Sequence, residues 1–183
     1  MTSEPRSGVR LPKRVEADPR AAELAAVLDS RPRVLWSGGR VRTPVVELGD
    51  ALARSLKGAH IARRITRGLE GVEEKLVGES RGLDQADQKA GAERGQRVSR
   101  LILLSNDGAE RLYRRVESLL RRFPGRLLVI QLEADSTRIG AVFSTDGSTT
   151  KVLMLDHKDA VADALLALAV RDVPEPPFDA TLA

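Results

Sequence analysis

The run Leu101-Ile102-Leu103-Leu104 constrains the fold of this chain more than any other feature. Four consecutive apolar residues with polar residues on both sides are typical of a buried central strand. A serine-asparagine-aspartate-glycine turn follows at once and leads into a strongly amphipathic segment. The run therefore predicts a small sheet covered by helices, in the α/β or α+β class.

The block 100–172 contains the clearest pattern of the chain and is predicted to be its α/β core. Its elements in chain order are the strand at 101–104, a helix that ends at Pro124-Gly125, strands over 127–132, 138–144 and 151–155, and a last helix through 161–168. Asp146-Gly147 is the turn expected between the last two strands. The predicted order is β-α-β-β-β-α.

The stretch 138–144 allows a second interpretation. Asp135 or Ser136 is a suitable N-cap residue, so a short helix could begin there instead of a strand. The block would then read β-α-β-α-β-α, in three layers.

The region 18–77 is predicted to hold helices and one hairpin. Asp18-Pro19 favours a helix over about 19–29, and Gly38-Gly39 lies between two short β-prone runs, as in a hairpin. Over 47–77 leucine, isoleucine and valine recur at helical spacing, and Gly58 is expected to divide this stretch into two helices. We expect residues 18–172 to form one domain.

Three segments lack this patterning. Residues 1–17 are predicted to be a flexible basic tail, and residues 173–183 a second flexible tail. Residues 78–99 are polar and contain four glycines, which predicts a loop, although 83–93 could hold a short polar helix.

Composition excludes several classes of protein. The 183 residues include no cysteine and only two histidines, which excludes disulfide frameworks, thiol nucleophiles and cysteine-based metal sites. No apolar run is long enough to span a bilayer, and the N-terminus lacks a signal-peptide pattern. We therefore expect a cytoplasmic protein without membrane contact, metal or other cofactor.

The charge is unevenly distributed along the chain. Residues 1–126 carry 26 basic and 17 acidic side chains, whereas residues 127–183 carry four basic and nine acidic ones. An asymmetry of this kind indicates either a basic surface for a polyanion or two halves that attract each other within the fold.

Arginines are concentrated in two segments that are predicted to be helical. Arginine is the preferred contact for phosphate because its planar guanidinium group binds two oxygens at once. On the second segment, pairing with Glu110 and Glu117 at helical spacing is the alternative interpretation. The nucleic-acid-binding candidates are Arg63, Arg64, Arg67, Arg111, Arg114, Arg115, Arg121 and Arg122.

The turn after the first core strand is a second candidate site. Ser105, Asn106, Asp107 and Gly108 lie where ligands gather in open α/β sheets and where a helix N-terminus offers free N–H groups. Asp107 is expected either to cap the following helix, with Glu110 completing a capping box, or to hold a metal. The cluster around His157 is expected to cap the last helix, and no residue is nominated as catalytic.

These patterns favour a non-enzymatic binding protein that contacts the backbone of RNA or DNA without reading its sequence. Aromatic residues are too few to support base stacking. One alternative is a small nucleotide- or phosphate-using enzyme with its site at 105–108. The other is a protein-interaction adaptor that binds a protein partner or a second copy of itself.

Overall fold

The computed structural model describes residues 9–90 and 96–170. Within these two ranges, six strands form one mixed sheet in the order β1-β2-β5-β4-β6-β3. The strands are β1 (Pro32–Val34), β2 (Arg42–Val46), β3 (Ile65–Arg67), β4 (Arg100–Leu104), β5 (Leu127–Leu132) and β6 (Val152–Leu155). The helices are α1 (Lys13–Glu16), α2 (Ala21–Ser30), α3 (Asp50–Ile61), α4 (Leu69–Ala90), α5 (Glu110–Arg122), α6 (Ser136–Ala141) and α7 (Lys158–Leu168). The mixed α/β class predicted from the sequence is confirmed.

The strand predicted to be central, β4, lies between β5 and β6. It runs parallel to β5 and antiparallel to β6. Leu101 and Leu103 contribute to one apolar core and Ile102 and Leu104 to another, and none of the four is more than 1% exposed. The continuous apolar run is therefore explained by burial on both faces of the sheet.

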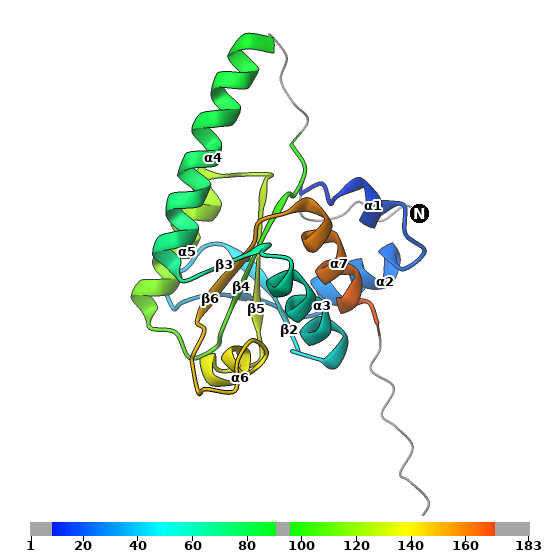
Figure 1. The fold of residues 1–183 in the computed structure, drawn as a ribbon, viewed down its shortest axis with the longest axis vertical. Coiled ribbons are helices and arrows are strands. Elements are labelled where there is room, and N and C mark those ends of the chain that lie inside the picture. The colour runs from blue at the N-terminus through cyan, green and yellow to red at the C-terminus, as the bar shows by residue number, and fades with distance from the viewer. Residues whose placement is uncertain (1–8, 91–95, 171–183) are drawn as a thin grey trace, which may run out of the picture.

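Helices cover both faces of the sheet and give a three-layer arrangement. Figure 1 shows α4 and α5 on one side, and α1, α2, α3 and α7 on the other. Leu52 and Leu56 of α3 pack in the core with Leu101, while Leu76 of α4 and Val116 of α5 pack in the core with Ile102. The short helix α6 lies at one end of the sheet.

The strand predicted over 138–144 is wrong, and the alternative helix is confirmed. Asp135 caps α6, because its carboxylate accepts a hydrogen bond from the backbone N–H of Arg138 at 2.7 Å. Ile139 is only 1% exposed and anchors this short helix in the core. The C-terminal block is therefore β-α-β-α-β-α.

The turn at Asp146-Gly147 exists, but it does not join two strands as predicted. It connects α6 to β6, with Gly147 in a left-handed conformation (φ 79°) and Asp146 accepting a hydrogen bond from the Ser148 N–H at 2.9 Å. The following backbone packs on α6, where a Cβ atom at Gly140 would lie 1.9 Å from the Ser148 carbonyl oxygen. Only glycine allows this approach.

The division of 47–77 at Gly58 is also wrong. Gly58 lies inside α3, because burial of Leu52, Leu56 and Ala59 outweighs the roughly 1 kcal/mol cost of one glycine in a helix. The helix ends at Ile61 instead, and the chain then forms the short strand β3, which pairs antiparallel with the free edge of β6.

The loop predicted over 78–99 is wrong as far as residue 90, because α4 continues to Ala90. Residues 91–95 lie outside the described ranges, as do residues 1–8 and the predicted tail 173–183. Of the predicted N-terminal tail, residues 9–17 are placed: α1 buries Val15 completely, and the Arg10 carbonyl accepts a hydrogen bond from the Val98 N–H at 2.8 Å.

Two other predictions are confirmed: a helix close to 19–29, which is α2, and the β1–β2 hairpin. Within the described part of the chain, no helix is both long enough and apolar enough to cross a membrane.

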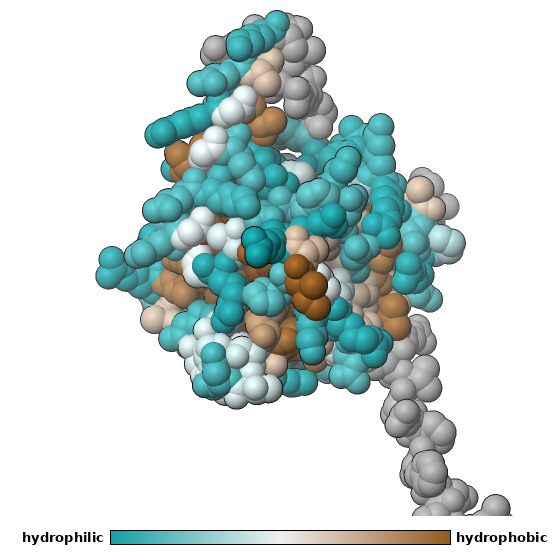
Figure 2. Space-filling view, in the orientation of Figure 1, coloured by the Kyte–Doolittle hydropathy of each residue, from teal (hydrophilic) through white to brown (hydrophobic). Residues whose placement is uncertain are grey.

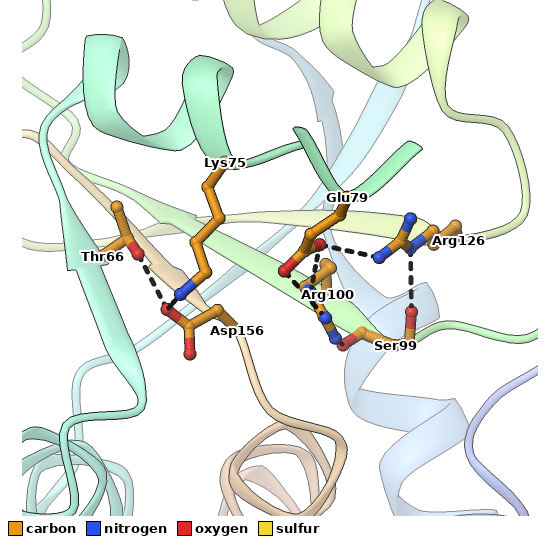
Figure 3. Close-up of polar contacts among 7 residues, drawn as sticks. All are labelled: Thr66, Lys75, Glu79, Ser99, Arg100, Arg126 and Asp156. Carbon is orange, nitrogen blue, oxygen red and sulfur yellow. Dashed lines mark hydrogen bonds and ion pairs between the residues drawn. The ribbon is translucent and has the colours of Figure 1, made fainter. Parts of the chain in front are cut away.

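Ion pairs connect α4 to the ends of three strands, β4, β5 and β6 (Figure 3). Near its start, Lys75 Nζ lies 2.6 Å from the Asp156 carboxylate, which also accepts a hydrogen bond from the Thr66 hydroxyl. Further along, Glu79 binds the guanidinium groups of both Arg100 and Arg126. Burial, together with repulsion from Arg100, lowers the pKa of Arg126, and Glu79 opposes this effect.

We predict that Glu79→Gln lowers the free energy of unfolding by about 2 kcal/mol, because it leaves two poorly solvated guanidinium groups without a counter-charge. Glu74→Gln, five residues earlier at an exposed position of α4, is the matched control and should cost less than about 0.5 kcal/mol. Urea denaturation measures both values. Equal values for the two variants would contradict the anchoring role of Glu79.

Candidate nucleic-acid interface

The helix α5 is the platform of the candidate interface. Its apolar side packs on the sheet through Tyr113, Val116 and Leu119. Helical spacing then directs the remaining positions outward. The arginines predicted to face away from the core do so: four are exposed and Arg115 is half-buried. These α5 arginines are Arg111, Arg114, Arg115, Arg121 and Arg122.

Most of the α5 arginines have a local partner. Arg114 pairs with Glu110, and Arg121 lies 3.5 Å from Glu117, so the pairing offered as an alternative from the sequence is present. Arg115 binds Glu73 of α4 through two nitrogens. Only the Arg114–Glu110 pair is solvent-exposed on both sides, and a pair of that kind holds its side chains in place weakly.

The β1–β2 hairpin packs against α5 through one buried carboxylate. Glu117 is 1% exposed and accepts hydrogen bonds from the Trp36 indole N–H at 2.8 Å and the Arg40 backbone N–H at 3.2 Å. The Arg114 guanidinium stacks on the Trp36 ring, 4.4 Å from its centre. The loop that joins β1 to β2 is thereby fixed beside the α5 arginines.

This hairpin brings arginines that the sequence reasoning missed. Arg33, Arg40 and Arg42 line a shallow hollow of about 440 Å³ together with Pro32 and Val34. All three arginines are exposed. The sequence contained one signal, a basic residue on each side of the Gly-Gly turn, but it did not show that the hairpin packs against α5.

The other predicted group, Arg63, Arg64 and Arg67, is not on a helix, and its members lie on different surfaces. Arg67 belongs to β3 and lines a hollow with Arg111 and Arg115. Arg64 lines a different groove, between α3 and α7 on the opposite side of the sheet. Arg63 is exposed in the turn after α3, with a left-handed backbone (φ 56°). Only Arg67 joins the α5 arginines.

The turn at 105–108 is stabilised by Tyr113. The Gly108 N–H donates to the Tyr113 hydroxyl, and that hydroxyl donates to the Ser105 carbonyl, both at 2.8 Å. A side chain at Gly108 would collide with the tyrosine ring, since its Cβ would lie 2.9 Å from it. The Asn106 N–H donates to the Ala134 carbonyl. The backbone of this turn is therefore occupied with structural hydrogen bonds.

Asp107 does not cap α5, contrary to the capping-box prediction. The N-cap of α5 is Ala109, and the Asp107 carboxylate instead accepts hydrogen bonds from the backbone N–H and the hydroxyl of Ser136, at 3.0 and 2.7 Å. It thus links the end of β4 to the start of α6.

The pKa of Asp107 is lowered from its ordinary value. The buried Ser105 hydroxyl is the largest cause; it has no partner in hydrogen-bond geometry among the described residues but lies near enough to favour the ionised carboxylate. Burial opposes this effect, and the two hydrogen bonds from Ser136 reinforce it. The ionised form of Asp107 is therefore the one that the fold stabilises.

The cluster around His157 lies away from this turn. Because β6 is antiparallel to β4, Leu104 pairs with Val152 and Leu101 with Leu155, so His157 follows the strand end opposite to Asp107. His157 caps α7 by accepting a hydrogen bond from the Asp159 N–H at 3.3 Å, as predicted. In the part of the chain that the structure describes, no three acidic, histidine or cysteine side chains are placed to hold a metal.

No protein-family model matches the chain. No curated protein matches its sequence either.

We predict that Glu117→Ala lowers the free energy of unfolding by about 2–3 kcal/mol, because the Trp36 and Arg40 N–H groups lose their acceptor. Trp36 is the only tryptophan, so its fluorescence emission should move to longer wavelength as the hairpin loosens. Ser118→Ala, at an exposed position of the same helix, is the control and should leave the emission unchanged. An unaltered emission in Glu117→Ala would show that Glu117 does not fix the hairpin.

Asp107→Asn should lower stability by about 1 kcal/mol at pH 7, comparable to the loss of a helix cap. The folded-state pKa of Asp107 lies below its unfolded value, so the stabilisation is present above about pH 4 and is lost as the pH falls through the folded value. Thermal unfolding of wild type and variant should therefore converge at low pH. Asp29→Asn, at an exposed position of α2, serves as control, and a pH-independent difference would refute the linkage.

Proposed function

We propose that the protein binds the phosphate backbone of a nucleic acid through the α5 arginines and the adjoining hairpin arginines Arg33, Arg40 and Arg42. The observation that carries the proposal is the contact of Trp36 and Glu117, which fixes the hairpin beside α5. Two segments separated by about 70 residues of sequence thereby form one basic surface. Basic residues from separate segments on one face are the electrostatic footprint of polyanion binding.

The dimensions of α5 suit contacts with several phosphates. From Arg111 to Arg122 the helix axis extends roughly 16 Å at 1.5 Å per residue. A nucleic-acid strand rises about 3.4 Å per nucleotide, so this length faces about four or five phosphates of one strand. The hairpin arginines extend the same surface to the side.

The aromatic residues support backbone contact over base readout. Tyr113 is buried with its hydroxyl engaged in the turn at 105–108. Trp36 is half-buried and is covered by the Arg114 guanidinium. Tyr113 therefore offers no face for stacking on an unpaired base, and one face of Trp36 is covered. Binding should therefore be similar for unrelated sequences.

The two alternatives receive less support. Asp107, the residue of interest for a phosphate-using enzyme, is engaged by Ser136 and links β4 to α6. For an adaptor, a broad apolar surface would be expected, and the face in Figure 2 shows only small apolar spots separated by hydrophilic side chains. Backbone binding accounts for more of the surface chemistry than either alternative.

The proposal predicts salt-dependent binding of labelled oligonucleotides, measured by fluorescence anisotropy with a single-stranded RNA and a duplex DNA of unrelated sequence. The double variant Arg114→Gln, Arg121→Gln should bind less tightly, and the slope of log affinity against log salt should fall by about 1 per lost contact. The control Arg54→Gln removes an exposed arginine from α3, on the opposite side of the sheet, and should change neither quantity.

Absence of binding to both oligonucleotides at low salt would refute the proposal, as would equal losses in the double variant and in Arg54→Gln. Thermal unfolding of each variant checks that the arginine substitutions leave the fold intact.

A further inference from the structure

A hollow of about 700 Å³ lies where the β3–α4 turn meets the start of α5. Its charged lining consists of Arg67, Arg111 and Arg115, opposed by the single acid Glu70. Arg67 comes from β3, whereas Arg111 and Arg115 lie four residues apart on α5, so the fold brings two elements together at this hollow. This hollow is a different site from the one lined by the hairpin arginines.

Two of the three guanidinium groups are held in position. Arg67 donates to the Thr150 hydroxyl at 2.6 Å and stacks 5.2 Å from the centre of the Phe143 ring. Arg115 is oriented by Glu73, whose hydrogen bond is also the largest cause of its raised pKa. Positioned donors lose little conformational entropy when they bind an oxyanion.

The third guanidinium group is free to close on a ligand. Arg111 is exposed and makes no ion pair or hydrogen bond among the described residues. The hollow is thus lined by two arginines whose guanidinium groups have protein partners, and by one arginine that has none among the described residues. Arginine donors in this arrangement match an anion with several terminal oxygens.

Backbone exposed in the hollow adds to the arginines. Gly68 adopts a left-handed conformation (φ 84°), and nothing lies within 4 Å of the position that a Cβ atom would occupy there. Gly71 is the second glycine of the lining. Between them begins α4, whose first-turn N–H groups have no acceptor within the helix. A small anion can therefore approach the main chain as well as the guanidinium groups.

The remaining lining indicates what the anion carries. Leu69 and Leu112 are half-buried apolar walls, which suit the carbon skeleton of an organic ligand. Glu70 would repel an isolated anion, but a carboxylate in a phosphate site accepts hydrogen bonds from sugar hydroxyls. The volume is large enough for more than a phosphate group.

We propose that this hollow binds a phosphate monoester that carries hydroxyl groups, as in a nucleotide or a sugar phosphate. A monoester presents three terminal oxygens and a charge near −2 at pH 7. A phosphate within a strand carries a single charge and is esterified to a nucleotide on each side. The site does not depend on backbone binding by α5. The same monoester also occurs at the phosphorylated end of a strand, so both sources have to be compared.

Calorimetric titration of the full chain tests the proposal with adenosine 5′-monophosphate, ribose 5-phosphate, inorganic phosphate and adenosine. The first two should bind, inorganic phosphate should bind less tightly, and adenosine should not bind. Affinity for the monoesters should rise between pH 5 and pH 7, as the second ionisation near pH 6 is completed. A 5′-phosphorylated oligonucleotide, compared with its 5′-hydroxyl form, shows whether a strand end is also accepted.

Two substitutions in the hollow are expected to change affinity in opposite directions. Damage to the fold would lower affinity in both, so the pair distinguishes loss of a ligand contact from loss of structure. Arg111→Gln should weaken binding of adenosine 5′-monophosphate about tenfold, through loss of charge-assisted hydrogen bonds. Glu70→Gln should strengthen binding of inorganic phosphate roughly two- to fivefold, because a repelling charge is removed. Arg54→Gln, on the opposite side of the sheet, is the control and should change neither affinity.

Equal binding of adenosine and its monophosphate, or no binding of any monoester, would overturn the assignment. A loss of affinity for inorganic phosphate in both Arg111→Gln and Glu70→Gln would also overturn it, because removing an attracting and a repelling charge from this hollow must change that affinity in opposite directions. Monoester binding without any oligonucleotide binding would leave this site standing and refute the backbone proposal instead. The reverse result would refute only the hollow.

Discussion

Burial of β4 on both faces is the constraint on which the rest of the structure depends. Leu101 and Leu103 require apolar cover on one side and Ile102 and Leu104 on the other, so helices must pack on both faces of the sheet. Polar residues are then confined to the outer faces of the helices and to the ends of the strands. The arginine-rich side of α5 and the hydrogen-bonded turn at 105–108 occupy these two kinds of position.

The same architecture decides which charges remain available. Acidic residues of the C-terminal part pair with basic residues from earlier in the chain, as in Lys75–Asp156, Arg31–Glu133 and Arg14–Asp163. The charge asymmetry had two explanations, and these pairs support the one in which the two parts of the chain attract each other. Among the described residues, the ion pairs of the α5 arginines involve only glutamates of α4 and α5, so the acidic residues described between 127 and 170 do not neutralise that surface.

The sequence predicted elements best where one physical signal dominated. β4 and α5 follow from a continuous apolar run and a strong apolar stripe. The strand predicted over 138–144 failed because Ile139 and its apolar neighbours suit a strand and a short helix equally well, and the deciding hydrogen bond from Arg138 to Asp135 is local. The role of Glu117 could not be predicted, because its burial depends on a hairpin about 80 residues away.

The α5 arginines differ in how strongly their glutamate partners hold them, and in the proposed binding this decides which of them can turn to a phosphate. Arg114 and Glu110 are both at least half exposed, and a pair of this kind contributes only about 0–1 kcal/mol, so in the backbone proposal a phosphate replaces Glu110 at little cost. Arg121 is also exposed, but its partner Glu117 is buried and stays bound to the N–H groups of Trp36 and Arg40. Arg115 is less exposed and is held by two hydrogen bonds from its guanidinium group to Glu73. In the proposed monoester site it is the arginine with a fixed partner, whereas the backbone proposal relies on the more exposed arginines. The two proposals therefore depend mainly on different arginines of one helix.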